Sequence, residues 1–287
     1  MTIIRSKDIY SLCEKSDIKD VMIAYEKELS GKTEEEILSQ MELSFKIMEE
    51  STKYSLENKT SGKIIGGETK KLYSYINNND TLSDKSTLRA IMYGFSVMEK
   101  NVSMGKIVAC PTAGSCGVLP GVLVMLKEKF DYSDEEILRA MFMASAIGII
   151  IGKNASLSGA EGGCQAEIGS ASAMASAAAV VLKNGTLKQA FDAAAICLKN
   201  LMGLVCDPVA GLVESPCLKR NAIGISNALI SADIALAGIE SIIPFDEVVK
   251  AMNSVGKSMP CALRETAEGG IAISKTGIKI SEKIKAL

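Results

Sequence analysis

The stretch that most constrains the fold is residues 165–181, QAEIGSASAMASAAAVV, which consists almost entirely of small side chains. A helix built from such residues can approach its neighbours very closely, so we expect it to be buried on most sides. Alternation of polar and apolar residues typical of strands is scarce elsewhere in the chain. The predicted fold class is therefore all-α, with buried small-residue helices packed against other helices.

Other helices are expected from apolar periodicity and from helix-start signals. Thr33 is a predicted N-cap because three acidic residues follow it, and Ser133 has the same role before DEEIL. A polar loop with a tight Gly66-Gly67 turn is expected over residues 61–71. The predicted helices cover about 17–27, 33–56, 84–100, from 118 onward, 133–151, 165–181, 186–204, 218–239 and 245–258.

The chain of 287 residues is long enough for one large domain or two ordinary ones. It contains no repeat, low-complexity tract or flexible linker. We expect a single compact domain over residues 1–287. Its N-terminal helical layer would precede a core at about 101–287 that carries the reactive residues.

Composition excludes several classes of function. The net charge of −2, the aromatic content of 5% and the lack of Trp give no basis for binding nucleic acid. The most apolar stretch, residues 140–152, is too short to cross a membrane. The chain starts with charges of both signs and no apolar signal segment, so we expect a cytoplasmic protein with reduced cysteines.

Three of the eight cysteines, Cys164, Cys206 and Cys217, lie in glycine- or proline-containing segments that interrupt helices. Cys164 precedes a predicted helix, whose N-terminus favours the thiolate. The chain has no histidine, so a bound metal would need sulfur or oxygen ligands. Three thiolates without a fourth suggest a soft-metal or iron–sulfur site with one open position. Spacing alone leaves buried structural cysteines as an equal alternative.

The loop PTAGS, from Pro111 to Ser115, combines hydroxyls with free amides before a helix, an arrangement that binds anions such as carboxylates. For a lone motif of this kind, an ordinary capped loop is the favoured explanation. The segment SGKIIGG from Ser61 is similar and weaker. Asn154 and Ser156 lead towards Cys164, either lining the same cavity or serving as polar loop residues.

Taken together, several long motifs carry a specific resemblance. They are CPTAGSCGVLPGVL, NASLSGAEGGCQAEIGSASAMA, LVCDPVAGLVESPCLKRNAIGISNA and MPCALRETAEGGIA. In this order and spacing they resemble the α subunit of iron–sulfur-dependent L-serine dehydratase, an L-serine ammonia-lyase. The resemblance covers nearly the whole chain, including DVMIAYE and SGKIIGGETKKL.

The resemblance implies a site for a [4Fe–4S] cluster, held on loops by Cys164, Cys206 and Cys217, with the fourth iron left for substrate. It implies that the PTAGS and SGKIIGG loops grip the carboxylate and amino group of serine. Cys110, Cys116, Cys197 and Cys261 are not assigned to the cluster, although Cys116 or Cys261 is a minor candidate for covering the open iron. The implied substrate-binding residues are Ser61, Gly66, Gly67, Pro111, Thr112, Ala113, Gly114, Ser115, Asn154 and Ser156, with Thr112 and Ser115 also catalytic.

The implied reaction converts L-serine to pyruvate and ammonia, in amino-acid degradation and gluconeogenesis. The chain has the length of an α subunit alone, so a β subunit is the expected partner, in a heterodimer or a higher oligomer. No motif supports pyridoxal phosphate. The general base is not identified, and the partner is one possible source. The alternatives are a lyase acting on threonine or cysteine, or a non-catalytic subunit that senses metal or redox state.

Overall fold

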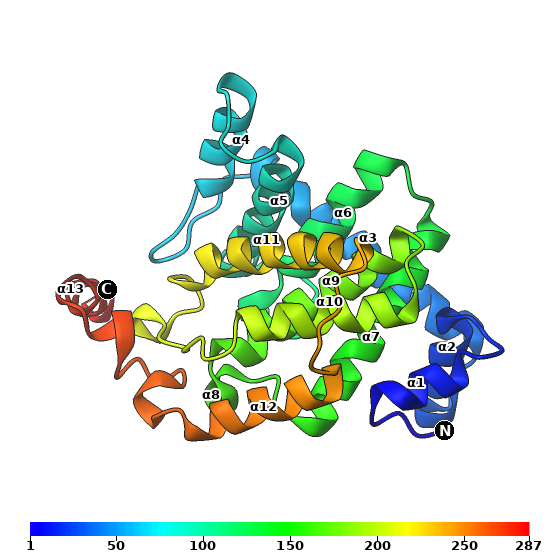
Figure 1. The fold of residues 1–287 in the computed structure, drawn as a ribbon. Coiled ribbons are helices and arrows are strands. Elements are labelled where there is room, and N and C mark those ends of the chain that lie inside the picture. The colour runs from blue at the N-terminus through cyan, green and yellow to red at the C-terminus, as the bar shows by residue number, and fades with distance from the viewer. Residues whose placement is uncertain (287) are drawn as a thin grey trace.

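The computed structural model describes residues 1–286 and confirms the all-α class (Figure 1). Within these residues there is no strand, and the one β-type contact is an isolated parallel bridge between Cys206 and Arg264. The helices are α1 Ser6–Leu12, α2 Ile18–Ser30, α3 Glu34–Glu57, α4 Glu68–Asn78, α5 Lys85–Val102, α6 Val118–Phe130, α7 Asp134–Asn154, α8 Gly159–Gly162, α9 Ser170–Leu182, α10 Leu187–Asn200, α11 Cys217–Leu236, α12 Phe245–Ser258 and α13 Lys275–Lys285.

Helix α9 lies at the centre of the molecule, and every one of its residues is buried. It packs against α6, α7, α10 and α11, as its small side chains allow (Figure 1). One detail differs from the expected continuous helix, because residues Gln165–Gly169 form a π-helical turn, η2, ahead of α9. Such turns often occur at functional sites, and this one follows Cys164 directly.

The predicted helix starts are confirmed. Thr33 Oγ1 accepts a hydrogen bond from the Glu36 amide, and the Glu36 carboxylate accepts one from the Thr33 amide. Ser133 and Glu136 form the same capping box at α7. Asp84 caps α5 by accepting from two amides. These signals are local, so the sequence alone predicts them well.

The segment expected as a loop over residues 61–71 is shorter in the structure. It ends at Gly67, which has φ +89°, and α4 begins at Glu68. Glycine adopts the left-handed conformation at little energetic cost, and an acidic residue in the first turn stabilises the helix that follows. Helices α3, α4 and α5 pack together, and α4 projects from the upper edge of the molecule in Figure 1.

The N-terminal helices share a core with the rest of the chain. One cluster of buried apolar side chains includes Ile3, near the N-terminus, and Met252, in α12. The single domain over residues 1–287, with its core at about 101–287, stays a prediction. None of the helices within residues 1–286 has the length and apolar character needed to span a membrane.

Candidate functional site

The structure brings Cys164 and Cys206 into contact and places Cys217 near the charge of Cys164. Cys164 precedes η2, Cys206 lies in the loop after α10, and Cys217 is the first residue of α11. All three are buried. The Cys206 thiol contacts Cys164 and lowers the pKa of that thiol, assisted by the Arg220 guanidinium. Burial raises the pKa of Cys217 to about 12, with the nearby charge of Cys164 as the next cause.

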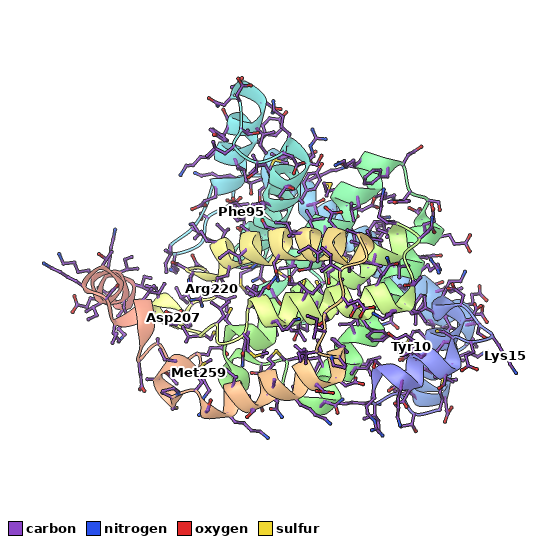
Figure 2. The ribbon with its side chains drawn as sticks, in the orientation of Figure 1. Tyr10, Lys15, Phe95, Asp207, Arg220 and Met259 are labelled. Atoms are coloured by element: carbon purple, nitrogen blue, oxygen red, sulfur yellow. The ribbon has the colours of Figure 1, made fainter. Side chains whose placement is uncertain are left out.

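A buried ion pair holds the loop of Cys206 against the helix of Cys217. Arg220 Nη2 lies 2.6 Å from Asp207 Oδ1, and Arg220 Nη1 donates to the Val205 carbonyl at 2.7 Å. Figure 2 places Arg220 and Asp207 side by side near the start of α11. Arg220 lies one helical turn after Cys217, so it projects from the same side of α11.

The C-terminal segment fixes the same loop from another direction. The Cys206 amide donates to the Leu263 carbonyl at 2.8 Å, and the Glu265 amide donates to the Cys206 carbonyl at 2.7 Å. The Ile271 amide donates to Asp207 Oδ2 at 2.8 Å. The position of Cys206 therefore depends on residues about sixty positions further along the chain.

A cavity of about 450 Å³ lies beside these thiols. Glu167, from the π-turn, connects the cavity to the cysteines. Its carboxylate accepts from Thr112 Oγ1 at 2.7 Å and from Cys206 Sγ at 3.7 Å. Burial raises the pKa of Glu167. The lining residues are Thr112, Ala113, Gly114, Ser156, Leu157, Ser158, Glu167, Val213 and Glu265.

The PTAGS loop borders this cavity in a fixed conformation. Thr112 and Ser115 form a capping box, in which the Thr112 amide donates to Ser115 Oγ at 3.3 Å. Asn221, from α11, donates to the Gly114 carbonyl at 2.8 Å. Within residues 1–286, the amides of Ala113 and Gly114 donate to no acceptor. These two amides are therefore available to an anion in the cavity.

The remaining predicted substrate residues lie in different places. Ser115 is fully buried behind the cavity wall. The side-chain Nδ2 of Asn154 donates to the carbonyls of Ile4 and Ile150. Asn154 lines a neighbouring pocket, which shares only Ser156 with the first. Pro111, Ser61, Gly66 and Gly67 are not among the lining residues. Their roles in binding substrate stay predictions.

The two cysteines considered as covers for an open iron also lie apart. Cys116 is fully buried, with its Sγ 3.6 Å from Met98 Sδ. Cys261 is exposed. Neither residue lines the cavity.

Four charged residues of the site were not singled out from the sequence: Asp207, Glu167, Glu265 and Arg220. Glu167 carried a readable signal, because it is the one charged residue within positions 165–181. The donor atoms of Glu167, Cys206 and Glu265 lie within 4.8 Å of one another. Cys164 and Cys206 are in contact, Cys217 is buried near the charge of Cys164, and two carboxylates face Cys206. These sulfur and oxygen donors fit an iron–sulfur cluster with a non-thiolate position.

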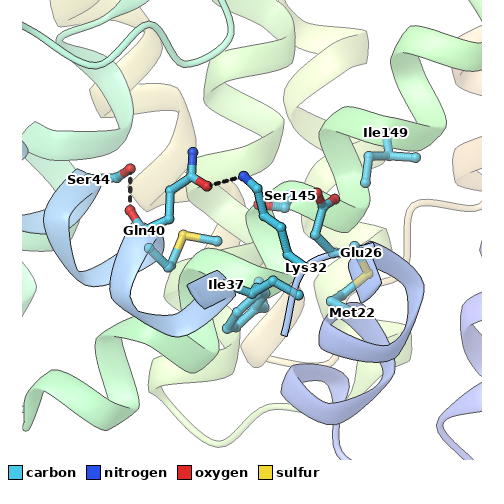
Figure 3. Close-up of a pocket in the computed structure, with 10 residues that line it drawn as sticks. Met22, Glu26, Lys32, Ile37, Gln40, Ser44, Ser145 and Ile149 are labelled. Atoms are coloured by element: carbon cyan, nitrogen blue, oxygen red, sulfur yellow. Dashed lines mark hydrogen bonds between the residues drawn. The ribbon is translucent and has the colours of Figure 1, made fainter. Parts of the chain in front are cut away.

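A separate pocket of about 260 Å³ lies between α2, α3 and α7 (Figure 3). Its floor is apolar, with Met22, Ile37 and Ile149, and Lys32 donates to Gln40 at its edge at 2.6 Å. It shares no residue with the cavity beside the cysteines.

Comparison with known proteins identifies the class to which this fold and site belong. Residues 14–272 match the family model described as serine dehydratase alpha chain, so the chain belongs to that family. It is 52% identical to the probable L-serine dehydratase alpha chain of Bacillus subtilis, over 93% of this chain and 89% of that protein. It is 48% identical to the L-serine dehydratase alpha chain of Peptoniphilus asaccharolyticus, over 96% of both chains. The L-serine dehydratase of Mycobacterium bovis is 32% identical over 94% of this chain, which spans 61% of that longer protein.

Proposed function

We propose that this chain is the α subunit of an iron–sulfur-dependent L-serine dehydratase, which converts L-serine to pyruvate and ammonia. The observation that carries the proposal is the contact of the buried Cys164 and Cys206, with Cys217 nearby, next to a cavity lined by Thr112 and Glu167 in a member of this family. We infer the substrate, L-serine, from the names of the relatives. We further propose a cytoplasmic setting, where thiols stay reduced, and a role in amino-acid degradation that feeds gluconeogenesis through pyruvate.

Cys164, Cys206 and Cys217 would hold the [4Fe–4S] cluster. When bound, such a cluster supplies an iron that acts as a Lewis acid towards the β-hydroxyl of the substrate, a poor leaving group. Arg220 places a positive charge beside Cys164, which favours its thiolate. The ion pair of Arg220 and Asp207 holds the loop of Cys206 against the helix that begins at Cys217.

The cavity complements both charges of a free amino acid. The amides of Ala113 and Gly114, which have no acceptor within residues 1–286, suit the carboxylate of serine. The carboxylates of Glu167 and Glu265 suit its ammonium group. Thr112 donates to Glu167 and so holds that carboxylate in place at the cavity wall. Ser115 supports Thr112 from behind.

Anaerobic reconstitution with iron and sulfide tests the cluster assignment. The wild-type chain should take up about four irons, and Cys164→Ala, Cys206→Ala and Cys217→Ala should each abolish this uptake. Cys261→Ala is the matched control, because that thiol is exposed and lies outside the cavity. A normal iron content in Cys217→Ala would make the ligand assignment wrong.

The preference for serine is tested by comparing kcat/KM for serine, threonine and cysteine. We expect serine to have the highest value, as the names of the relatives suggest. A sensing subunit would instead bind metal without any turnover, even in the presence of its partner.

A further inference from the structure

The SGKIIGG loop wraps around a buried carboxylate from a distant part of the chain. Glu214 is 5% exposed, and its side chain accepts hydrogen bonds from three successive amides. These are the amides of Lys63, Ile64 and Ile65, at 3.0, 2.7 and 3.0 Å. Successive amides of this kind form an anion-binding nest, and here the nest is filled by the protein itself.

A second buried carboxylate holds both ends of this loop. Glu99, in α5, is fully buried and accepts from Thr60 Oγ1 and from the Thr69 amide, each at 3.1 Å. Gly62 leaves room for the first carboxylate, because a Cβ at this position would lie 2.4 Å from Glu214 Oε2. The loop is therefore fixed to the N-terminal helices and shaped to receive Glu214.

Glu214 itself lies three residues before Cys217, in the segment that leads into α11. The Leu218 amide donates to the Glu214 carbonyl at 3.0 Å, which places Glu214 just before the first turn of α11. Val213, the preceding residue, lines the cavity. A shift of Glu214 would therefore move Cys217 and the adjoining cavity wall together.

We propose that Glu214 is a positioning residue for Cys217, and that the SGKIIGG loop serves to hold it in place. The consequence for a bound cluster rests on the proposed function, whereas the link to Cys217 itself does not. Both oxygens of a carboxylate accept hydrogen bonds, and neither donates. A glutamine would point its NH₂ group, a donor, at one of the amides and lose at least one hydrogen bond. The amides of Lys63, Ile64 and Ile65 are occupied by Glu214, so we assign these three amides to the positioning of Cys217.

The link is tested first in the cluster-free, reduced full-length chain. Glu214→Gln should raise the alkylation rate of Cys217 by iodoacetamide about tenfold, because loss of charge-assisted hydrogen bonds increases local opening. Peptide mass spectrometry measures each cysteine separately, and the fully buried Cys197 should not change. Glu36→Gln is the control, because the Glu36 carboxylate accepts from the Thr33 amide at the start of α3, outside both the SGKIIGG loop and the Cys217 segment.

A second variant approaches the same contact from the loop. Gly62→Ala should also raise the Cys217 rate, since its methyl group displaces the carboxylate. If both changes act through one contact, the double variant should react little faster than either single variant. Gly62→Ala also provides the readout if Glu214→Gln does not fold.

Reconstituted enzyme separates positioning from substrate binding. Positioning predicts faster loss of iron to a chelator in Glu214→Gln, with an unchanged KM for serine. An unchanged Cys217 rate in both single variants would overturn the proposal, as would a normal rate of iron loss together with a raised KM. A wild-type chain that takes up no iron would contradict the proposed function instead, while the alkylation result would still stand.

Discussion

Arg220 and Asp207, which do not line the cavity, show how single residues beside the cysteines support the site. Their side chains are only 12% and 3% exposed, and Asp207 also accepts from the Ile271 amide. A buried pair contributes little net stability when intact, but removing one partner leaves the other charge unpaired. The pair therefore fixes the geometry of the site, and replacing either residue should strongly destabilise the protein.

Arg220→Met should lower the free energy of unfolding by about 3–5 kcal/mol, because it leaves the Asp207 carboxylate buried without its partner. Urea unfolding of the reduced, cluster-free chain measures this change. Arg139→Met is the control, since the pair of Arg139 and Asp17 is 38% and 36% exposed. That variant should lose at most about 1 kcal/mol. Equal losses in the two variants would contradict the structural account.

At the scale of elements, helices α5 and α6 pack closely because glycines lie at their contact. A Cβ on Gly121, in α6, would lie 2.6 Å from the Ala90 carbonyl oxygen of α5 and 3.0 Å from Ile225 Cδ1 of α11. A Cβ on Gly94 would lie 2.9 Å from the Gly117 carbonyl oxygen. These close approaches set the distance between α5 and the start of α6, where the PTAGS loop ends.

In Gly121→Ala the added methyl group meets backbone that must shift, which costs about 1–3 kcal/mol. Alanine stabilises a helix by about 1 kcal/mol relative to glycine, so we expect a net destabilisation of up to about 2 kcal/mol. Gly169→Ala is the matched control, because the nearest atom to its Cβ would be at 3.6 Å, an ordinary contact. Urea unfolding of both variants provides the comparison. A stabilised Gly121→Ala would show that these helices have room to separate.

The elements also show what the sequence predicts well. Thr33, Asp84 and Ser133 start helices through contacts within a few residues, so periodicity and capping located those starts. The π-turn before α9 was missed, because its backbone pattern depends on neighbours in space. The sequence does not predict the early end of the 61–71 loop either, since a Gly66-Gly67 pair is equally compatible with a longer loop.

At the scale of the whole molecule, the site lies where four distant segments meet. They are the PTAGS loop, the segment from Ser156 to Glu167, the loops of Cys206 and Cys217, and the segment around Glu265. Glu265 is exposed at the edge of the cavity. The cavity thus reaches solvent in the single chain, whereas closing an active site from water strengthens its electrostatic interactions.

We therefore expect the isolated α chain, even with its cluster, to deaminate serine slowly or not at all. Adding a purified β subunit under anaerobic conditions should raise the rate of pyruvate formation by at least about tenfold, if it covers the cavity or supplies the missing base. The rate at saturating serine, with and without the partner, is the measurement. No gain on addition of the partner would contradict the proposed αβ enzyme.

Some features of the site could be foreseen in the sequence and others could not. Cys164, Cys206 and Cys217 stood out because glycine and proline surround them, and the family motifs supported their assignment. Thr112, Ala113, Gly114 and Ser156 line the cavity, and their role in binding substrate stays a prediction. The roles of Glu214 and Arg220 were not visible, since nothing in their local sequence names a partner.

The sequence by itself determined the helical class, most helix starts and the buried small-residue helix. It also singled out Cys164, Cys206 and Cys217 as candidate ligands. The helical features follow from propensity, capping and periodicity, which act over a few neighbouring residues. The tertiary structure alone decided which side chains meet at the site. Lys63 and Glu214 are 151 positions apart, and Thr112 and Glu167 are 55 apart. Such contacts depend on how helices pack, and helix packing is fixed by the whole core at once.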